Sequence, residues 1–492
     1  MSEENKLNYM INIESFNLDS RPRVVSPWRI RNDNANMIVY KCVTSNITYK
    51  VLSPLETLVV PFLNGNNTIG EICKYWLDIH NAKESKIQEL TKLFNQTMDS
   101  LVKSEFVEEQ GDISPSYTDN KKTWVPDFGN YNYPSLRLEK PISVNIEMTN
   151  HCVTDCRYCY AERLLCDELN FEQLKKLFQE LSENEIYIVE IGGADFFSRP
   201  DSISILAEMV KRDFVFFIST KCFISEEKAE SLASLGIGTQ NVHPHLKRIF
   251  QISIDSADNE IASFLVRRKD YLKSTVSSVE NCIKAGLIPR IKCVLTSFNA
   301  DAPRRLVEKF SGMGITEFQF VQYGRSNFRH DESLFLSLEN KLRFIETAAL
   351  LRKEYPEISF TFQEDKNTGG AIKRSKEQWE SRSICSGGRA SLLLKPNGDV
   401  ILCEQIPHRP VYVMGNLVEQ SLNEVWHSKK MLDFLYAPRE LFKNTACEKC
   451  PDFEKCHYEK GYCYRDALFN YNTIYEAPSD CPFQSRAGIR QI

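Results

Sequence analysis

The chain has 492 residues, of which 42% are hydrophobic and 26% are charged, and its formal net charge is −5. This length allows about two to four domains with sizeable apolar cores. Charges of both signs are interspersed, which argues against nucleic acid or an anionic membrane surface as the main partner. The acidic N-terminus lacks the apolar core of a signal peptide, and no apolar run is long enough to span a bilayer. We therefore expect a cytoplasmic protein without a membrane segment.

Residues 20–110 have the pattern of a small winged-helix domain. Apolar runs at 37–43 and 47–52 predict two strands that flank a turn at 44–46. Ser53 is expected to cap a helix, with Glu56 completing the capping box. A second helix is expected at 69–80, capped by Thr68, and a third at 84–103. A short strand is expected at 106–108.

The stretch from Leu52 to Ile72, L-S-P-L-E-T-L-V-V-P-F-L-N-G-N-N-T-I-G-E-I, resembles the PqqD-like recognition element of ribosomal-peptide maturases. That resemblance implies a domain that binds a leader peptide as an added strand. A DNA-binding winged helix is the alternative interpretation. The absence of a dense basic patch argues against it.

A polar stretch at 111–140, rich in Asp, Asn, Ser, Tyr and Pro, predicts a linker. Beyond it, apolar runs alternate with amphipathic segments such as 171–183 and 201–212, which is typical of a parallel α/β sheet. A second polar stretch at 364–383 ends this region. Six strands are expected, at 144–148, 187–191, 214–219, 250–254, 289–295 and 317–322.

Three cysteines follow the first of these strands in a C-x3-C-x2-C loop: Cys152, Cys156 and Cys159. Closed 4Fe–4S clusters have four cysteine ligands, so three thiolates would leave one iron open. An open iron can chelate the amino and carboxylate groups of S-adenosylmethionine (SAM), and electron transfer to the sulfonium then releases a 5′-deoxyadenosyl radical. A zinc site is the alternative, but such sites normally pair two short cysteine motifs.

The loop and its place after a strand resemble the radical SAM superfamily, which implies a partial (β/α)6 TIM-like barrel. By the same resemblance, Tyr158 and Tyr160 match aromatic positions near the cluster and the adenine. Gly192 and Gly193 match the G-G-E-P loop, whose backbone approaches the methionyl amino group. Ala194-Asp195 replaces Glu-Pro here, and Asp195 is the expected carboxylate.

Ser253 and Asp255 stand on the strand where relatives bind the ribose or the carboxylate of SAM, and Arg267 or Arg268 would be the basic partner. Each of these features also has an ordinary structural interpretation. A Gly-Gly pair is often only a turn, and a Ser or Asp at a strand end is often a helix cap.

A second cysteine array begins with Cys385, Gly398 and Cys403. It continues as C-x2-C-x5-C-x6-C and a final cysteine: Cys447, Cys450, Cys456, Cys463 and Cys481. The array resembles the SPASM extension of radical SAM enzymes, which carries two auxiliary 4Fe–4S clusters. One departure is the x6 gap before Cys463, where the family usually has x3. The turn at 396–399 predicts a hairpin that brings Cys385 and Cys403 together on adjacent strands.

The resemblance assigns Cys385, Cys403 and Cys463 to the first auxiliary cluster and the other four cysteines to the second. The first set has three ligands, so one iron is open to substrate or to another residue. Two structural zinc sites are the alternative, but seven cysteines do not divide into two four-cysteine sites. Glu404 stands where some relatives place an acid that deprotonates the substrate, and it is our candidate general base. A solvated strand residue is the other interpretation.

The remaining six of the 16 cysteines are scattered, and most are expected to be buried apolar side chains rather than disulfides. These are Cys42, Cys73, Cys166, Cys222, Cys282 and Cys293.

The sequence thus predicts a leader-peptide recognition domain (1–110), a linker (111–140), a radical SAM partial barrel (141–375) and a SPASM domain (376–492). The expected function is a SAM-dependent oxidoreductase with three 4Fe–4S clusters that installs a cross-link, preferably a thioether, in a ribosomally synthesised precursor peptide. A reductant such as flavodoxin or ferredoxin would supply electrons. Carbon–carbon cross-linking, epimerisation and formylglycine formation are alternative reactions. A non-catalytic iron–sulfur or zinc scaffold that binds peptide or DNA is the alternative outside enzymes.

Overall fold

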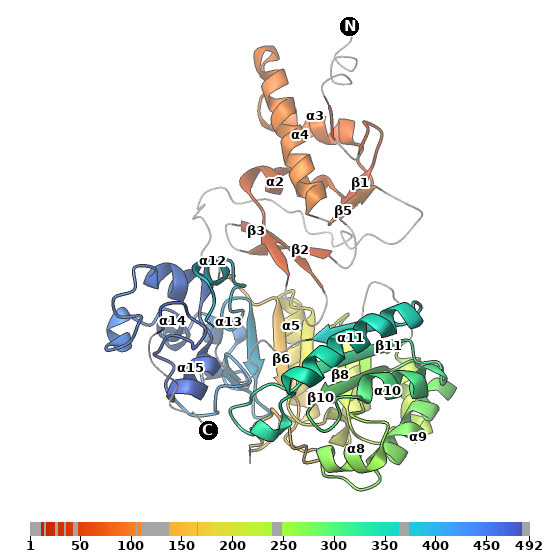
Figure 1. Ribbon diagram of the computed structural model, residues 1–492. Coiled ribbons are helices and arrows are strands. Elements are labelled where there is room, and N and C mark those ends of the chain that lie inside the picture. The colour runs from red at the N-terminus through yellow and green to blue at the C-terminus, as the bar shows by residue number, and fades with distance from the viewer. Residues whose placement is uncertain are drawn as a thin grey trace. The chain divides into compact units, whose positions relative to one another are not determined.

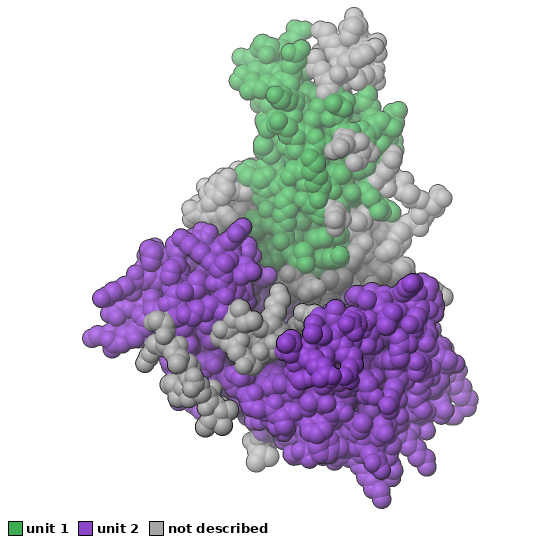
Figure 2. All heavy atoms as spheres, in the orientation of Figure 1, with its two compact units in different colours: residues 1–139 green, residues 140–492 purple. Residues whose placement is uncertain are grey.

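The computed structural model forms two compact units, Met1–Glu139 (unit 1) and Lys140–Ile492 (unit 2) (Figures 1 and 2). The residues that it describes are 11–13, 16–24, 28–33, 36–42, 48–104, 106–109, 137–164, 166–238, 248–363 and 373–484. The predicted turn at 44–46 and nearly all of the predicted linker lie outside this set. None of the helices in the described part of the chain has the length and apolarity that a membrane crossing needs.

Unit 1 contains a three-stranded antiparallel sheet in the order β2 (Trp28–Asp33), β3 (Asn36–Lys41) and β4 (Tyr49–Val51). A second pair, β1 (Pro22–Val24) and β5 (Val107–Glu109), is also antiparallel. The strands expected near 37–43, 47–52 and 106–108 are confirmed. Strand β2 was not predicted, because only Trp28 and Ile30 supply its apolar alternation before the polar pair Asn32-Asp33, which is too short to mark a strand.

Three helices pack on these strands: α2 (Pro54–Val59), α3 (Ile69–Ile79) and α4 (Ile87–Lys103). Short 3-10 turns follow α2 (η1, Val60–Phe62) and precede α4 (η2, Glu84–Lys86). The predicted capping box at Ser53 is present, and the predicted cap Thr68 also forms a box with Glu71, which explains where α2 and α3 begin. Their apolar faces meet in a core of their own around Trp76 and Phe94.

Unit 2 is built on one ten-stranded sheet in the order β12-β11-β10-β9-β8-β7-β6-β13-β14-β15. The six predicted strands form with bounds close to those expected, and neighbours among them are parallel. They are β6 (Ser143–Glu147), β7 (Ile188–Gly192), β8 (Val215–Thr220), β9 (Ile249–Ser253), β10 (Arg290–Leu295) and β11 (Glu317–Gln322). Strand β12 (Ser359–Gln363) adds a parallel strand that the sequence did not indicate.

Helices connect the parallel strands and cover the outside of the sheet, as expected for a partial (β/α) barrel (Figure 1). They are α5 (Phe171–Glu183), α6 (Ser202–Lys211), α7 (Glu226–Ser234), α8 (Asn259–Val266), α9 (Tyr271–Lys284), α10 (Ala302–Ser311) and α11 (Leu338–Glu354), with 3-10 turns η5 (Phe196–Ser198) and η6 (Glu332–Leu334). Outward-facing strand residues and inward-facing helix residues form one continuous core.

The C-terminal part extends this sheet. Strand β13 (Ser391–Leu394) pairs in parallel with β6, and β14 (Asp399–Ile401) and β15 (Gly415–Asn416) follow antiparallel. The elements beyond are short: α12 (Lys376–Glu380), α13 (Leu422–Trp426), α14 (Lys429–Leu435), η7 (Arg439–Phe442), the π-helical turn η8 (Lys455–Lys460) and α15 (Tyr464–Tyr471). The predicted hairpin turn is present, with Gly398 at a φ of +87°.

One detail of the hairpin prediction is wrong. Cys385 lies before β13 and Cys403 lies after β14, so neither stands on a strand. The reason is local: the amides of Arg389 and Ala390 bond back to the carbonyl of Ser386, and this turn begins the hairpin late. The two cysteines are nevertheless brought close, because Gly387 packs directly against the Leu402 carbonyl.

The hairpin turn also places a buried cation in the barrel. The Nζ atom of Lys395 lies 3.1 Å from both carboxylate oxygens of Glu147 on β6 and 3.4 Å from Glu162. Lys395 is completely buried, and burial raises the pKa of Glu147 to about 7 although Lys395 opposes this shift. Since removing one partner of a buried pair typically costs about 3–5 kcal/mol, this contact holds the hairpin against the barrel.

Candidate active site

A cavity of about 410 Å³ runs from the carboxyl ends of the parallel strands into the barrel. This is where α/β barrels place their ligand sites. Of the predicted site residues, the cavity is lined by Cys152, Cys156, Cys159, Tyr158, Tyr160, Gly192, Gly193, Asp195, Ser253 and Glu404. Among the predicted SAM-binding residues, Asp255 and Arg267 do not line it, and neither do the seven auxiliary cysteines.

The cysteine loop after β6 is held by hydrogen bonds rather than by regular structure. The Thr154 hydroxyl lies 3.4 Å from the sulfur atoms of both Cys152 and Cys156. The amides of Asp155 and Arg157 donate to carbonyls at the end of α8, at 3.1 and 2.9 Å. The spacing of the three thiols is therefore fixed by the fold before any metal binds.

Arg267 supports this loop and does not face the cavity. It ends α8 in a left-handed conformation, with φ 54°, and its guanidinium lies 2.8 Å from the Asp155 carboxylate. Arg329 makes a second ion pair with Asp155 at 2.8 Å and donates to the Asp155 and Cys156 carbonyls. Arg267 and Arg329 thus hold the cysteine loop in place. The sequence had suggested instead that Arg267 contacts the cofactor directly.

Asp255 is likewise a positioning residue. It is completely buried, and its carboxylate accepts hydrogen bonds from the Tyr158 hydroxyl, from Lys221 Nζ at 3.2 Å and from the Val294 amide at 3.0 Å. Burial raises the pKa of Tyr158, and the neighbouring Asp255 adds to the rise. Ser253 does line the cavity, where its hydroxyl lies 3.0 Å from that of Ser219.

The Gly192-Gly193 loop reaches the cavity as expected, but the Asp195 carboxylate is fully engaged by the protein. It accepts from the Thr220 hydroxyl at 2.8 Å and from the amides of Lys221, Cys222 and Phe197 at 2.6, 3.1 and 3.2 Å. Asp195 therefore ties this loop to the end of β8. The Gly192-Gly193 backbone, rather than the Asp195 carboxylate, is what the loop presents to the cavity.

Glycine is required at position 193 by two separate features. Its φ is +83°, and a Cβ there would lie 2.9 Å from the Glu147 Cβ. The close approach to β6 keeps the loop backbone at the cavity wall.

Glu404 lies in the cavity because the next residue anchors it. The Gln405 side chain donates from Nε2 to the Tyr160 carbonyl at 3.1 Å, and the Asn327 side chain donates from Nδ2 to the main-chain carbonyl of Gln405 at 2.8 Å. Burial raises the pKa of Glu404, while the positive charges of Arg465 and Lys292 oppose this shift. A carboxylate with a raised pKa is suited to accept a proton near neutral pH.

Sequence reasoning missed the cations of this cavity: Arg163, Lys221, Lys292, Arg325 and Arg465. Lys292 is the clearest case, since burial together with Lys221 and Arg290 lowers its pKa to about 8. A lysine inside the apolar run of β10 was the signal that could have revealed it, because period-two alternation turns it inward.

The three cysteines assigned to the first auxiliary site lie close to one another. Burial raises the pKa of Cys403 to about 12, and the Cys385 and Cys463 thiols add to the rise. Burial raises the pKa of Cys463 to about 11, again with a contribution from Cys385. These residues come from three separate segments, so the fold gathers them.

The other four cysteines form a separate group around a small void that all of them line: Cys447, Cys450, Cys456 and Cys481. Burial raises the pKa of Cys481 to about 11, with contributions from Cys456 and Cys450. Burial also raises the pKa of Cys447, and the other three thiols add to the rise. The seven cysteines thus divide in space into the same sets of three and four that the resemblance implied.

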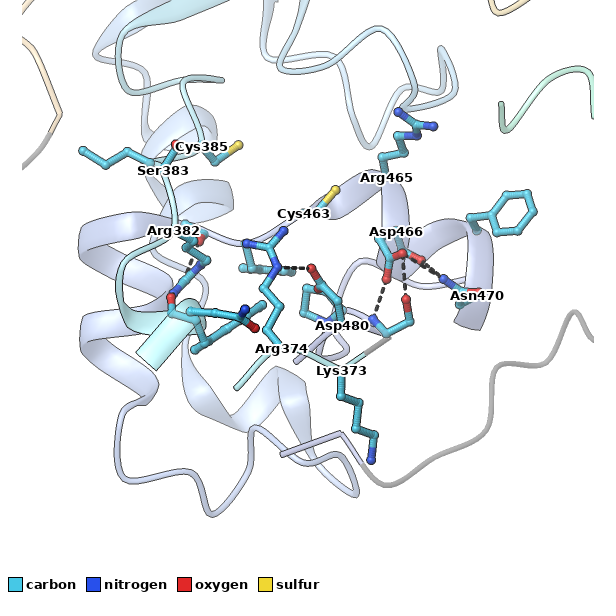
Figure 3. A pocket seen from close by; sticks show the side chains of 18 of the residues that line it. Lys373, Arg374, Arg382, Ser383, Cys385, Cys463, Arg465, Asp466, Asn470 and Asp480 are labelled. Carbon is cyan, nitrogen blue, oxygen red and sulfur yellow. Dashed lines mark hydrogen bonds and ion pairs between the residues drawn. The ribbon is translucent and has the colours of Figure 1, made fainter. Parts of the chain in front are cut away.

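A second cavity of about 830 Å³ adjoins the first set and includes Cys385 and Cys463 in its wall (Figure 3). An ion pair of Arg374 with Asp480, at 2.8 Å, closes one side. Arg325 and Arg465 line both this cavity and the one above the cysteine loop. The two cavities therefore share a basic wall.

The donor sets fit iron–sulfur clusters. Within the residues that the structure describes, no three His, Cys, Asp or Glu side chains converge tightly enough to hold a single metal ion. A cubic cluster needs wider spacing between its thiolates than one ion does, and thiolate is its usual ligand. Each of the three cysteine groups has further support in nearby hydrogen-bond donors, as Thr154 shows for the first.

Two family models match the chain. The Radical SAM superfamily model matches residues 146–299, and the SPASM model, described as an iron-sulfur cluster-binding domain, matches residues 385–452. The chain therefore contains a radical SAM domain and, in its C-terminal part, a SPASM domain. SAM binding and iron–sulfur chemistry are the properties of these two domains.

Individual relatives are distant. The mycofactocin maturase MftC of Mycolicibacterium smegmatis is 24% identical over 340 residues, which cover 68% of this chain and 80% of MftC. The sporulation killing factor maturation protein SkfB of Bacillus subtilis is 22% identical over 316 residues, covering 61% of this chain and 68% of SkfB.

Among solved structures, Streptococcus suis SuiB bound to its precursor peptide SuiA gives a TM-score of 0.62 at 16% identity, covering 94% of this chain and 100% of that one. SuiB bound to S-adenosylmethionine gives 0.59 at 15% identity, with the same coverage. These likenesses confirm the expected fold class.

Replacing Gly193 with Ala should weaken SAM binding about tenfold or more. The new Cβ meets Glu147, and the left-handed backbone adds strain of about 1–3 kcal/mol, where 1.4 kcal/mol is tenfold in affinity. Equilibrium dialysis of SAM with the reconstituted protein measures this. Gly286→Ala is the matched control, since Gly286 has a φ of +77° but no atom within 4 Å of a new Cβ. Unchanged SAM affinity in Gly193→Ala would show that the loop does not form the site.

Proposed function

We propose that this radical SAM enzyme is a maturase that cross-links a ribosomally made precursor peptide, with a thioether as the favoured bond. The observation that carries the proposal is the placement of Glu404 in the SAM cavity, directly after a cysteine of the three-membered auxiliary set. The relatives support the same class, since two carry maturation in their names and SuiB binds a precursor peptide.

The cysteine loop would hold the radical cluster, and the Gly192-Gly193 backbone, Ser253 and Lys221 are placed to receive SAM beside it. The sets of three and four cysteines would hold the two auxiliary clusters. When bound, these groups supply a 5′-deoxyadenosyl radical for hydrogen abstraction, an electron acceptor and, where a fourth cysteine is lacking, a site for a substrate thiolate.

The chain's own residues then handle protons and orientation. Thioether closure removes one hydrogen atom from carbon, one proton from the thiol and one electron from the forming bond. Glu404 is the base placed to take the proton, and its raised pKa suits that step. Arg465, in the wall of both cavities, lies where it can hold the peptide between them.

Unit 1 is proposed to hold the leader segment of the precursor. Its three-stranded sheet has β2 and β4 at its edges, and an extended peptide can add to such an edge through main-chain hydrogen bonds. Separating leader binding from chemistry would allow the barrel to act on a core sequence that it grips weakly. A flavodoxin or ferredoxin is the proposed electron source.

The rival reactions differ in what the cavity must contain. Epimerisation usually requires a cysteine that returns a hydrogen atom. In the described part of the chain, the cavity wall contains no cysteine besides those of the C-x3-C-x2-C loop. Carbon–carbon cross-linking is the closest competitor, because it needs the same radical and the same base but no substrate thiol.

The triple variant with Cys152, Cys156 and Cys159 replaced by Ala should lose reductive cleavage of SAM. It should also drop from roughly twelve irons per chain to roughly eight, since each cluster contains four irons. Iron analysis after anaerobic reconstitution and chromatography of 5′-deoxyadenosine measure both. Formation of 5′-deoxyadenosine at the normal rate would show that this loop is not the radical site.

A chain that begins at Lys140 should bind the precursor at least about tenfold more weakly, because it lacks the sheet edge that would pair with the leader. Uncoupled SAM cleavage should persist. Fluorescence anisotropy with a labelled precursor measures the affinity, and a leaderless core peptide, which should bind both chains equally, is the control. Equal precursor affinity would refute the role of unit 1, and tight binding of unit 1 to duplex DNA would support the winged-helix alternative.

The product should be lighter than the precursor by the mass of two hydrogen atoms for each cross-link, with one cysteine per cross-link lost to alkylation. Mass spectrometry before and after iodoacetamide treatment tests this. The same mass loss with every cysteine still alkylatable would identify a carbon–carbon bond. Deuterium uptake at an α-carbon without loss of mass would identify epimerisation.

A further inference from the structure

Arg389 is a buried cation without a counter-charge. Its side chain is completely buried, and its Nη2 donates to the His457 carbonyl at 2.7 Å. The Nε and Nη1 atoms are buried and make no hydrogen bond of ordinary geometry, while the Tyr464 hydroxyl, also buried and unpaired, lies near the guanidinium. No carboxylate among the described residues pairs with this guanidinium. A buried cation with two unused donors is costly, so its neighbourhood should contain an acceptor when the protein is complete.

The open side of Arg389 faces the first auxiliary set. A Cβ placed on Gly461 would lie 2.7 Å from Arg389 Nη1 and 3.0 Å from the Cys385 Cβ, so guanidinium and cysteine flank the same backbone atom. Tyr464 lies near both groups, because the Arg389 guanidinium and the Cys385 thiol both act electrostatically on its hydroxyl. Gly461, with a φ of +70°, leaves the space for this approach.

The second set has arginines of its own. Arg382 Nη2 lies 3.1 Å from the Cys456 sulfur, and Arg439 donates to the Cys450 carbonyl at 2.8 Å. The positive charge between the two cysteine sets therefore comes from guanidinium groups.

We infer that Arg389 is a positioning residue for the cluster of the first auxiliary set, donating hydrogen bonds from Nε and Nη1 to its sulfur atoms. This inference depends on the proposed function, which puts a cluster there. A cation and hydrogen bonds at the sulfur atoms favour the reduced cluster and so raise its reduction potential. Arg389 thereby makes the first auxiliary cluster a better acceptor for the electron released in cross-link formation. Through the His457 carbonyl, it also connects this site to the second set.

The test measures potentials rather than turnover. Arg389→Met and Arg389→Lys are made in the full-length chain with Cys152, Cys156 and Cys159 replaced, so that only auxiliary clusters contribute to the spectrum. Redox titration monitored by electron paramagnetic resonance should show one cluster shifted to a lower potential in Arg389→Met, by at least tenfold in the equilibrium constant, or 59 mV for one electron. Arg389→Lys, which retains the charge, should shift it less.

Arg248→Met is the matched control. Arg248 is also buried, but it lies at the start of β9 and donates to the Phe214 and Val210 carbonyls. Its loss should leave both auxiliary potentials unchanged.

Unchanged potentials in both Arg389 variants would overturn the inference alone. Should Arg389→Met fail to retain iron, Arg389→Lys decides: a shifted potential supports the inference, while an unshifted one or a loss of iron there too assigns Arg389 a structural role. If the parent chain holds iron for a single cluster only, the proposed function fails together with this inference.

Discussion

The parallel pairing of β13 with β6 is the constraint on which the rest of unit 2 depends. It makes the C-terminal hairpin part of the barrel sheet, and the buried contact of Lys395 with Glu147 locks it in register. The segment after the hairpin then carries Glu404 into the cavity that the loop after β6 also lines. One strand pairing thus brings Glu404 and the cysteine loop, which are far apart in sequence, to the same cavity.

Much of this could be read from the sequence where the signal is local. Apolar runs located β6 to β11, helix caps located α2 and α3, and the resemblance to SPASM domains assigned the cysteine sets that the fold gathers. Strand β12 escaped because Ser359–Gln363 is an edge strand with alternate residues exposed, so it lacks the apolar run of a buried strand. The pairing of β13 with β6 was not predicted, because no local pattern specifies a partner so distant in the chain.

The roles of single polar residues were the least predictable part. Asp195, Asp255 and Arg267 stand at the positions that the resemblance indicated, yet each of them bonds to protein. The partners of these three residues include backbone amides, a lysine and an aspartate. The sequence contains these groups but does not show which of them lie close together. A carboxylate that organises a site and one that contacts a ligand have the same spacing, and only the hydrogen-bond partners distinguish them.

The same accounting of partners explains why cluster binding and folding should be linked in the C-terminal part. The auxiliary cysteines form two groups, with the buried guanidinium of Arg389 beside the first, and burial raises the pKa of thiols such as those of Cys403 and Cys447. Without a cluster these thiols stay protonated, and the cation has no carboxylate partner among the described residues. Binding iron deprotonates the thiols, supplies the missing negative charge and gives the free N–H groups an acceptor. The arrangement that adjusts the first auxiliary cluster for electron transfer is thus the one that makes its binding stabilise the fold.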